Sequence, residues 1–286
     1  MNKTKLLLLS FLAFGLMAMK SDMKAYQYFN KKGKAISYEK MLKAVSDYDI
    51  IFFGELHNNA ISHWMEYELA KDLIAQKGDK MVLGAEMYEA DGQLLIDEYL
   101  SGLVKYKYFK AQARLWPNDP TDYKPLLELA YDNKIPFIAT NVPRRYAAAV
   151  NGGGFEILDK FSDEAKRYMA PLPIEYDPNV ACYKSMQEMM GKHGANIAKA
   201  QALKDATMAH FIMQNWEQGK TFLHFNGAYH SDNYEGIVWY LKKANPELKI
   251  VTITTVEQEN LDSVATESLK KADFILVANE DVTKTY

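Results

Sequence analysis

Short apolar runs alternate along the chain with longer segments in which apolar residues recur at helical spacing. This alternation is typical of βα proteins, and it predicts an α/β fold with a mostly parallel central sheet flanked by helices. The predicted strands are Asp49–Phe53, Met81–Ala85, Pro136–Ala139, Thr221–Phe225, Ile250–Thr254 and Phe274–Val277. The predicted helices are Ser62–Gln76, Asp91–Leu100, Tyr123–Asn133, Arg144–Val150 and Asn233–Lys243.

One stretch breaks the alternation. From Ser162 to Gln218 the pattern is helical throughout, interrupted by prolines and by the pair Gly191 and Gly194. We therefore predict a helical insertion at about residues 160–218 before the late strands, within a single domain of residues 21–286. The glycine pair would allow the insertion to act as a hinged lid over the site, and the pattern fits a rigid helical cap that only completes the core equally well.

Composition and charge remove several classes of function. Of 286 residues, 48% are hydrophobic and 25% charged, which is average for a globular protein. The net charge of −3 provides no basic field of the kind that binding to nucleic acid requires. Cys182 is the only cysteine, so the sequence offers neither an internal disulfide nor a cysteine-based metal site.

The N-terminus has the form of a secretory signal. A lysine-containing start is followed by an apolar run from Leu6 to about Met19, which is too short to span a bilayer comfortably. We therefore expect residues 1–20 to be a signal peptide and the protein to be exported, either periplasmic or associated with the cell surface. No cysteine follows this segment to be acylated, and no transmembrane domain is expected beyond it.

The strongest local signal for a site is Gly54-Glu-Leu-His57, directly after a buried strand. Side chains two residues apart project to the same side of an extended chain, so Glu55 and His57 can meet one ligand. In open α/β sheets ligands bind outside the carboxyl ends of the strands, where this segment lies. The alternative is that Glu55 caps the next helix and His57 is an ordinary loop histidine.

A second segment repeats the pattern, with His230 three residues after Gly227 at the end of another strand. Glycine at both places would let the backbone approach a ligand closely. Glu86, at the end of a third strand, either binds a ligand or orients a histidine. Glu55, His57, Glu86 and His230 could together hold a divalent transition metal with an open position for water.

Three more charged residues complete the candidate set. Arg144 and Arg145 lie where a helix begins, a place suited to binding carboxylate or phosphate. Asp205 lies on an apolar helix face, so it needs a partner, and a structural salt bridge with one of the two arginines explains it as well as a site role does. The sequence contains no Gly-x-Ser-x-Gly elbow, His-Glu-x-x-His helix, P-loop or Rossmann fingerprint.

Five motifs in order resemble those of the ChaN-like haem-binding uptake proteins, which are grouped with the TIKI and TraB proteins and the erythromycin esterases. The resemblance covers about Ile51 to Asn245. The motifs are Gly54-Glu-Leu-His57, Leu83-Gly-Ala-Glu-Met87, Asn141-Val-Pro-Arg-Arg145, Gln201-Ala-Leu-Lys-Asp-Ala-Thr-Met-Ala209 and Asn226-Gly-Ala-Tyr-His230.

This resemblance implies haem binding during iron acquisition, with dimerisation around stacked haems. A tyrosine or histidine would then ligate the haem iron, and the residues eligible by chemistry are Tyr146, Tyr183, His193 and His210. Tyr183 and His193 are preferred because they lie in the predicted insertion. The alternative is a metal-dependent hydrolase of peptides or esters that uses His57, His230 and Glu55 as catalytic residues, or His57 or His230 as a metal-free general base. Haem binding should tolerate His57→Ala, whereas hydrolysis should not.

Overall fold

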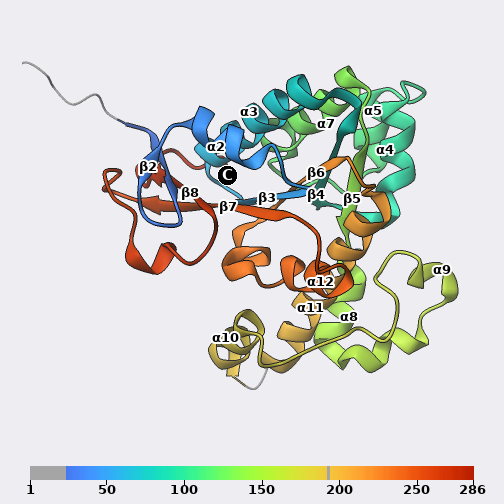
Figure 1. Ribbon diagram of the computed structural model, residues 1–286. Coiled ribbons are helices and arrows are strands. Elements are labelled where there is room, and N and C mark those ends of the chain that lie inside the picture. The colour runs from blue at the N-terminus through green and yellow to red at the C-terminus, as the bar shows by residue number, and fades with distance from the viewer. Residues whose placement is uncertain (1–23, 192–193) are drawn as a thin grey trace, which may run out of the picture.

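The computed structural model describes residues 24–191 and 194–286, and the predicted signal segment lies outside them. An eight-stranded sheet crosses the molecule in the order β2-β1-β8-β7-β3-β6-β4-β5 (Figure 1). This arrangement confirms the predicted α/β class with a mostly parallel sheet. The strands are β1 (Tyr26–Asn30), β2 (Ala35–Ile36), β3 (Ile50–Glu55), β4 (Met81–Glu89), β5 (Phe137–Asn141), β6 (Thr221–Gly227), β7 (Ile250–Gln258) and β8 (Phe274–Asn279).

The six predicted strands are all present and pair in parallel, and several run further toward their carboxyl ends than the sequence indicated. The hairpin β1–β2 was not predicted. It joins the edge of the sheet antiparallel to β8. Its strands are short and only partly buried, so they lack the continuous apolar run that marks a central strand.

The central strand β3 has an unbroken apolar sequence because both faces of the sheet are covered there. Ile51 and Phe53 pack into the cluster on one face, and Ile50 and Phe52 pack into the cluster on the other. All four side chains are fully buried because helices cover both faces. The two remaining residues of the strand, Gly54 and Glu55, are buried as well, although Glu55 is charged.

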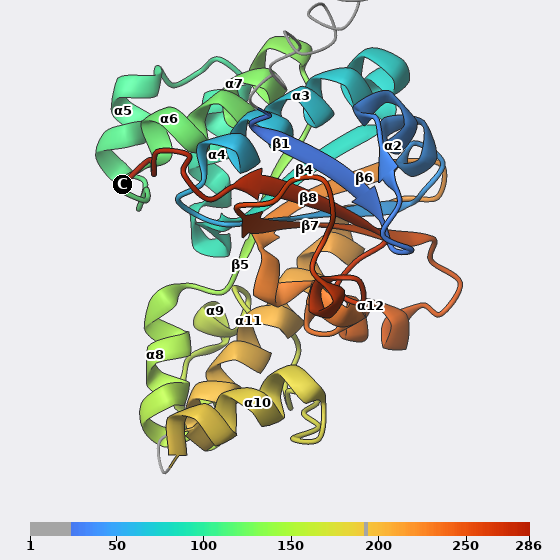
Figure 2. The ribbon, with the colours of Figure 1, turned by 90° about the vertical axis from the view of Figure 1, so that its left-hand side faces the viewer.

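Helices form a layer on each side of the sheet (Figures 1 and 2). One layer contains α2 (Tyr38–Val45), α3 (Ala60–Lys77), α4 (Gln93–Leu100), α5 (Tyr106–Gln112), α6 (Asp119–Asp122) and α7 (Lys124–Asn133). On the other face lie α11 (Gly194–Asn215) and α12 (Ile237–Ala244), and α8 (Arg144–Gly153), α9 (Asp163–Lys166) and α10 (Ala181–Met190) lie further from the sheet on that side.

Helix α12 begins four residues later than predicted. Asn233 and Tyr234 adopt left-handed backbone conformations, with φ of 59° and 61°. A right-handed helix cannot include such residues, so the regular helix starts at Ile237, after Gly236.

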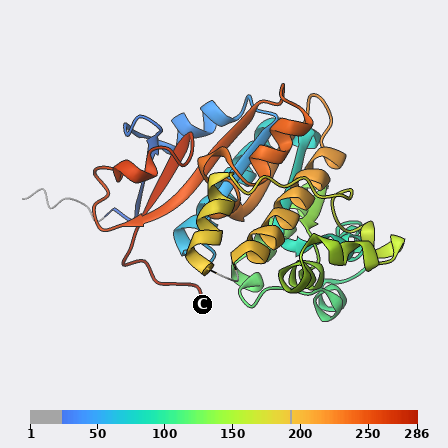
Figure 3. The same cartoon turned by 90° about the horizontal axis from the view of Figure 1, so that it is seen from below.

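The connection from β5 to β6 contains helices and, within its described residues, no strand. Its long helix α11 packs against β5 and α8, and α10 packs against α11 (Figure 3). The helical region therefore begins at α8, directly after β5, rather than at about residue 160 as predicted. Within the two described ranges, no helix combines the length and apolar character needed to cross a bilayer.

Candidate functional site

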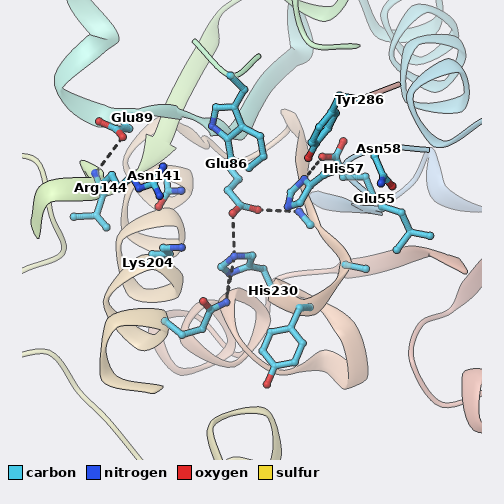
Figure 4. A pocket seen from close by; sticks show the side chains of 17 residues that line it. Glu55, His57, Asn58, Glu86, Glu89, Asn141, Arg144, Lys204, His230 and Tyr286 are labelled. Atoms are coloured by element: carbon cyan, nitrogen blue, oxygen red, sulfur yellow. Dashed lines mark hydrogen bonds and ion pairs between the residues drawn. The ribbon is translucent and has the colours of Figure 1, made fainter. Parts of the chain in front are cut away.

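The carboxyl ends of β3, β4, β5 and β6 surround a cavity of about 790 Å³ (Figure 4). These four strands are neighbours in the sheet and run parallel, so their ends meet at one edge. The residues around the cavity include Glu55, His57, Glu86, Glu89, Trp116, Asn141, Arg144, Gln201, Lys204, Tyr229, His230 and Tyr286. The structure therefore gathers the strand-end residues predicted from separate motifs into one pocket.

His57 forms a pair with the buried carboxylate of Glu55. Its Nδ1 lies 2.5 Å from Glu55 Oε1, which also accepts a hydrogen bond of 2.8 Å from the Tyr123 hydroxyl. The imidazole packs 4.8 Å from the Trp116 ring and remains 33% exposed. Burial lowers the pKa of His57, but the hydrogen bond and charge of Glu55 outweigh it and raise the pKa above its usual value.

Glu55 does not cap the following helix. The cap of α3 is Asn59, whose side chain accepts a hydrogen bond of 2.9 Å from the backbone N–H of Ser62. The Glu55 carboxylate therefore bonds His57 and takes no part in capping α3. Burial alone would raise the pKa of Glu55, but hydrogen bonds and positive charge from His57 and His63 hold it below its usual value.

His230 is held more tightly than His57. Its Nε2 lies 3.0 Å from Glu86 Oε1, and its Nδ1 bonds Asp205 on α11. The ring is buried, which by itself lowers the pKa, but the charges of Glu86 and Asp205 dominate and raise it to about 10. His230 is therefore a cation at neutral pH and cannot serve there as a general base.

Glu86 connects the two histidine segments. Its Oε1 faces His230, and its Oε2 accepts a hydrogen bond of 2.8 Å from the backbone N–H of Gly227. Burial raises the pKa of Glu86, but the positive charges of His230, His57 and Lys204 outweigh it and hold the pKa well below its usual value. Glu86 is therefore a fixed carboxylate at the centre of the pocket (Figure 4).

The glycines of the two Gly-x-x-His segments are required by space. A Cβ on Gly227 would lie 2.7 Å from His57 Nε2, and a Cβ on Gly54 would lie 3.0 Å from the Cα of Ala228. The predicted close backbone approach therefore occurs, although the neighbour is the other histidine segment.

The two predicted arginines, Arg144 and Arg145, lie in different surroundings. Arg144 lines the cavity with Lys204, and its backbone N–H bonds Glu89 at 3.1 Å. Arg145 instead pairs with Asp91 at 2.6 Å, outside the main cavity.

Asp205 does not pair with either arginine, so that interpretation is wrong. It accepts a hydrogen bond of 2.8 Å from the Tyr183 hydroxyl and bonds His230. Gly236 and the loop after β6 bring His230 to α11, which sequence spacing could not indicate.

The four candidates for a haem ligand have different surroundings. Tyr183 is fully buried and donates to Asp205, and Tyr146 is buried under Arg145. His210 is half-buried beside a surface hollow of about 330 Å³. His193 lies outside the described residues.

Several residues of the site were missed by sequence reasoning. Trp116 reaches the pocket from a loop, and Tyr123 reaches Glu55 from the start of α7. His63 on α3 lies 3.2 Å from Glu55 Oε2. The spacing of His63 and Glu66, three residues apart on a predicted helix, was the one available signal for a second cluster.

The predicted metal set of Glu55, His57, Glu86 and His230 is spread around the pocket. Among the described residues, the group whose donor atoms all lie within 4.8 Å of one another consists of Glu55, His63 and Glu66. Both ring nitrogens of His230 already face carboxylates.

A comparison with family models identifies one family. Residues 41–241 match the family model described as haem-binding uptake, Tiki superfamily, ChaN. No curated protein matches the chain.

Among solved structures, the chain is similar to ChaN of Campylobacter jejuni, whose structure describes cofacial haem binding. The TM-score is 0.70 at 17% identity, over 90% of this chain and 98% of that one. At this identity the likeness shows the fold alone. An erythromycin esterase matches with a TM-score of 0.45 and 10% identity, over 88% of this chain and 83% of the other.

Proposed function

This chain belongs to the ChaN family of haem-binding uptake proteins in the Tiki superfamily, and from that membership we propose that it binds haem. The observation that carries the proposal is the family match over residues 41–241. The fold shared with ChaN of Campylobacter jejuni supports it, since that protein binds haem cofacially.

A haem site needs an apolar surface and an axial ligand, and the region around His210 offers both. The hollow beside His210 lies between α11, α12 and the proline-containing segment after α9. Its walls are mostly apolar, and they include Pro171, Pro173, Ile174, Ala206, Ala209, Met213 and Tyr240. Burial lowers the pKa of His210, so its imidazole is neutral at neutral pH, which is the form that ligates iron.

The other described candidates fit less well. To reach a haem, the Tyr183 hydroxyl would have to leave its bond with Asp205 and the core around α10 and α11. Tyr146 packs in the core beneath the Arg145 guanidinium, which lies 4.4 Å from its ring centre. We therefore assign His210 as the axial ligand. Lys243 and Glu175, which also line the hollow, pair with each other at its rim.

A haemin titration of the purified chain tests the proposal. Wild type should show a shifted, saturable Soret band. His210→Ala should lose or strongly weaken it, while the pocket variant His57→Ala should retain it. Absence of saturable binding by wild type would contradict haem binding itself. Binding that survives His210→Ala and disappears in His57→Ala would instead move the haem to the main pocket.

A role in iron uptake requires export and, if haems stack, pairing of chains. We propose that the protein acts outside the cytoplasm, periplasmic or associated with the cell surface, and that haem promotes a homodimer. The lysine-containing N-terminus with its apolar run supports export. Cell fractionation with mass spectrometry of the N-terminus, and light scattering with and without haemin, would check the two statements. A full-length cytoplasmic protein, or one that stays monomeric with haemin, would contradict them.

One observation favours hydrolysis as a second candidate function. His57 is partly exposed in the pocket and bonded through Nδ1 to a buried carboxylate, the arrangement of a histidine general base. No described residue hydrogen-bonds its Nε2, so this nitrogen is available to a water molecule or a substrate in the pocket.

A panel of esters and short peptides tests this candidate. His57→Gln should abolish any turnover, and His210→Ala should leave it unchanged. Turnover that persists in both His57→Gln and His230→Gln would end the hydrolase hypothesis.

A further inference from the structure

A second polar cluster lies behind the pocket, between the end of β3 and the first turns of α3. It consists of Glu55, His63 and Glu66, whose exposed fractions are 1%, 6% and 0%. His63 Nδ1 lies 3.0 Å from Glu66 Oε2 and 3.2 Å from Glu55 Oε2. We call these three residues the inner cluster. Three donor atoms thus converge at one point within the core.

The other ring nitrogen of His63 faces two hydrogen-bond acceptors. His63 Nε2 lies 3.1 Å from the backbone oxygen of His57 and 3.3 Å from Asp122 Oδ2. A carbonyl oxygen only accepts hydrogen bonds, so Nε2 carries a hydrogen and donates it. Metal-bound histidines nearly always anchor their second nitrogen in this way, on a carbonyl or a carboxylate. Once Nδ1 loses its own proton, its lone pair faces the two glutamates.

The carboxylates of the inner cluster are incompletely satisfied. Glu55 Oε2 and Glu66 Oε1 are buried oxygens without a hydrogen-bond partner among the described residues. The first of these points at His63 Nδ1, whose single hydrogen, when present, goes to Glu66. Buried carboxylates without compensation are costly, so the cluster requires a positive charge, either a proton on His63 or a bound cation.

We propose that the inner cluster binds a divalent transition-metal ion, held by His63 Nδ1, Glu55 Oε2 and the carboxylate of Glu66. Ligand atoms about 2.0–2.2 Å from such an ion stand about 3.0–3.5 Å apart, which is the spacing seen around His63. Both oxygens of Glu66 can bind, so four donors are available without water. A mixed nitrogen and carboxylate set in a closed site favours Zn²⁺ or a similar ion over Ca²⁺, which takes six to eight oxygens.

The ion would also act on the pocket through Glu55. One oxygen of this carboxylate bonds His57 and Tyr123, and the other faces the inner cluster. Glu55 is therefore the residue through which the ion would fix the orientation of His57. This site shares Glu55 with the predicted set of Glu55, His57, Glu86 and His230 around the cavity, and it differs from that set in His63 and Glu66.

A proton is the competing occupant of the inner cluster. Burial lowers the pKa of His63, but hydrogen bonds and charges from Glu55 and Glu66 raise it to about 11. A protonated His63 would use its Nδ1 lone pair and block the metal. A direct measurement of binding is needed because the two occupants make similar contacts.

The test is a Co²⁺ titration of the full chain after treatment with a chelator, followed by visible absorption and elemental analysis. Wild type should bind about one Co²⁺ per chain. Glu66→Gln keeps the volume and removes the charge, and it should weaken binding by about tenfold or more. The matched control is His224→Gln, a buried histidine bonded to Thr140 and Asn226, and it should bind as wild type does.

Two results would overturn the proposal. One is the absence of stoichiometric Co²⁺ binding by wild type. The other is binding that is unchanged in Glu66→Gln and lost in Glu86→Gln, which would place the ion in the pocket. A crystal of the wild-type chain soaked in Co²⁺ decides the matter even if a variant fails to fold. An anomalous peak beside His63 Nδ1 supports the site, and a peak confined to other residues rejects it.

Discussion

The two Gly-x-x-His segments look alike in sequence and differ in their surroundings. His57 is one-third exposed and has one carboxylate partner, Glu55. His230 is buried between two carboxylates, Glu86 and Asp205. The first keeps a ring nitrogen available to the pocket, whereas the second is a fixed cation. The same motif therefore places a partly exposed histidine at one strand end and a buried, charged histidine at the other.

The difference arises from what covers each strand end. Helix α11 crosses the end of β6 and brings Asp205 and Gln201 to His230. The end of β3 is covered by the loop that carries Trp116, which contacts one side of the His57 ring. His230 is bonded to two carboxylates, Glu86 and Asp205, whereas His57 is bonded to Glu55 alone, so the pKa of His230 is raised further.

Asp205→Ala should have the largest effect on stability among the changes that separate the two histidine segments. This change removes a buried partner from both the cationic His230 and Tyr183, and we expect a loss of about 3–5 kcal/mol in the free energy of unfolding. Urea denaturation of wild type and variant measures it. Asp205→Asn retains hydrogen bonding and should lose less. Equal, small losses in both variants would show that His230 does not depend on this charge.

The pH dependence of stability separates the two histidines next. The folded pKa of His230, about 10, lies above its unfolded value near 6.5. Its contribution is therefore complete below pH of about 6.5 and is lost as the pH rises toward 10, by a few kcal/mol in all. Urea denaturation between pH 6 and 10 should show stability falling more steeply in wild type than in His230→Gln. Parallel curves would contradict the raised pKa.

Gly227→Ala should bring the two segments into collision. The new Cβ would lie 2.7 Å from His57 Nε2, so the ring must move, and we expect a loss of about 1–3 kcal/mol. Thermal unfolding gives the stability, and an NMR titration of His57 reports the displaced ring. Gly92→Ala is the control, because a Cβ there meets nothing within 4 Å. Equal stability of the two variants would show that the close approach is not tight.

The smallest effect is expected from His57→Ala. The ring is partly exposed, and Tyr123 still bonds Glu55 when the histidine is removed, so the loss should be about 1 kcal/mol. The corresponding change His230→Ala leaves two buried carboxylates unpaired and should cost several times more. Denaturant unfolding of both variants checks the ratio. A larger loss from His57→Ala would reverse the comparison.

Much of the fold was predictable because central parallel strands carry continuous apolar runs and end at recognisable polar motifs. All six predicted strands exist, and Glu55, His57, Glu86, Arg144 and His230 meet in one pocket as expected from strand ends. The edge hairpin β1–β2 escaped because partly buried, two- to five-residue strands lack such a run. The start of α12 was predicted too early because hydrophobic periodicity does not reveal the left-handed backbone of Asn233.

The sequence by itself determined the class of fold, the positions of the strand ends and the chemistry available there, since these follow from local pattern and residue type. Only the tertiary structure decided the partners. In the structure Asp205 pairs with His230 and not with an arginine, and His63 lies beside Glu55 behind the pocket. The physical reason is that the charge state of a buried group depends on neighbours brought together by packing across the sheet, and sequence distance does not encode those contacts.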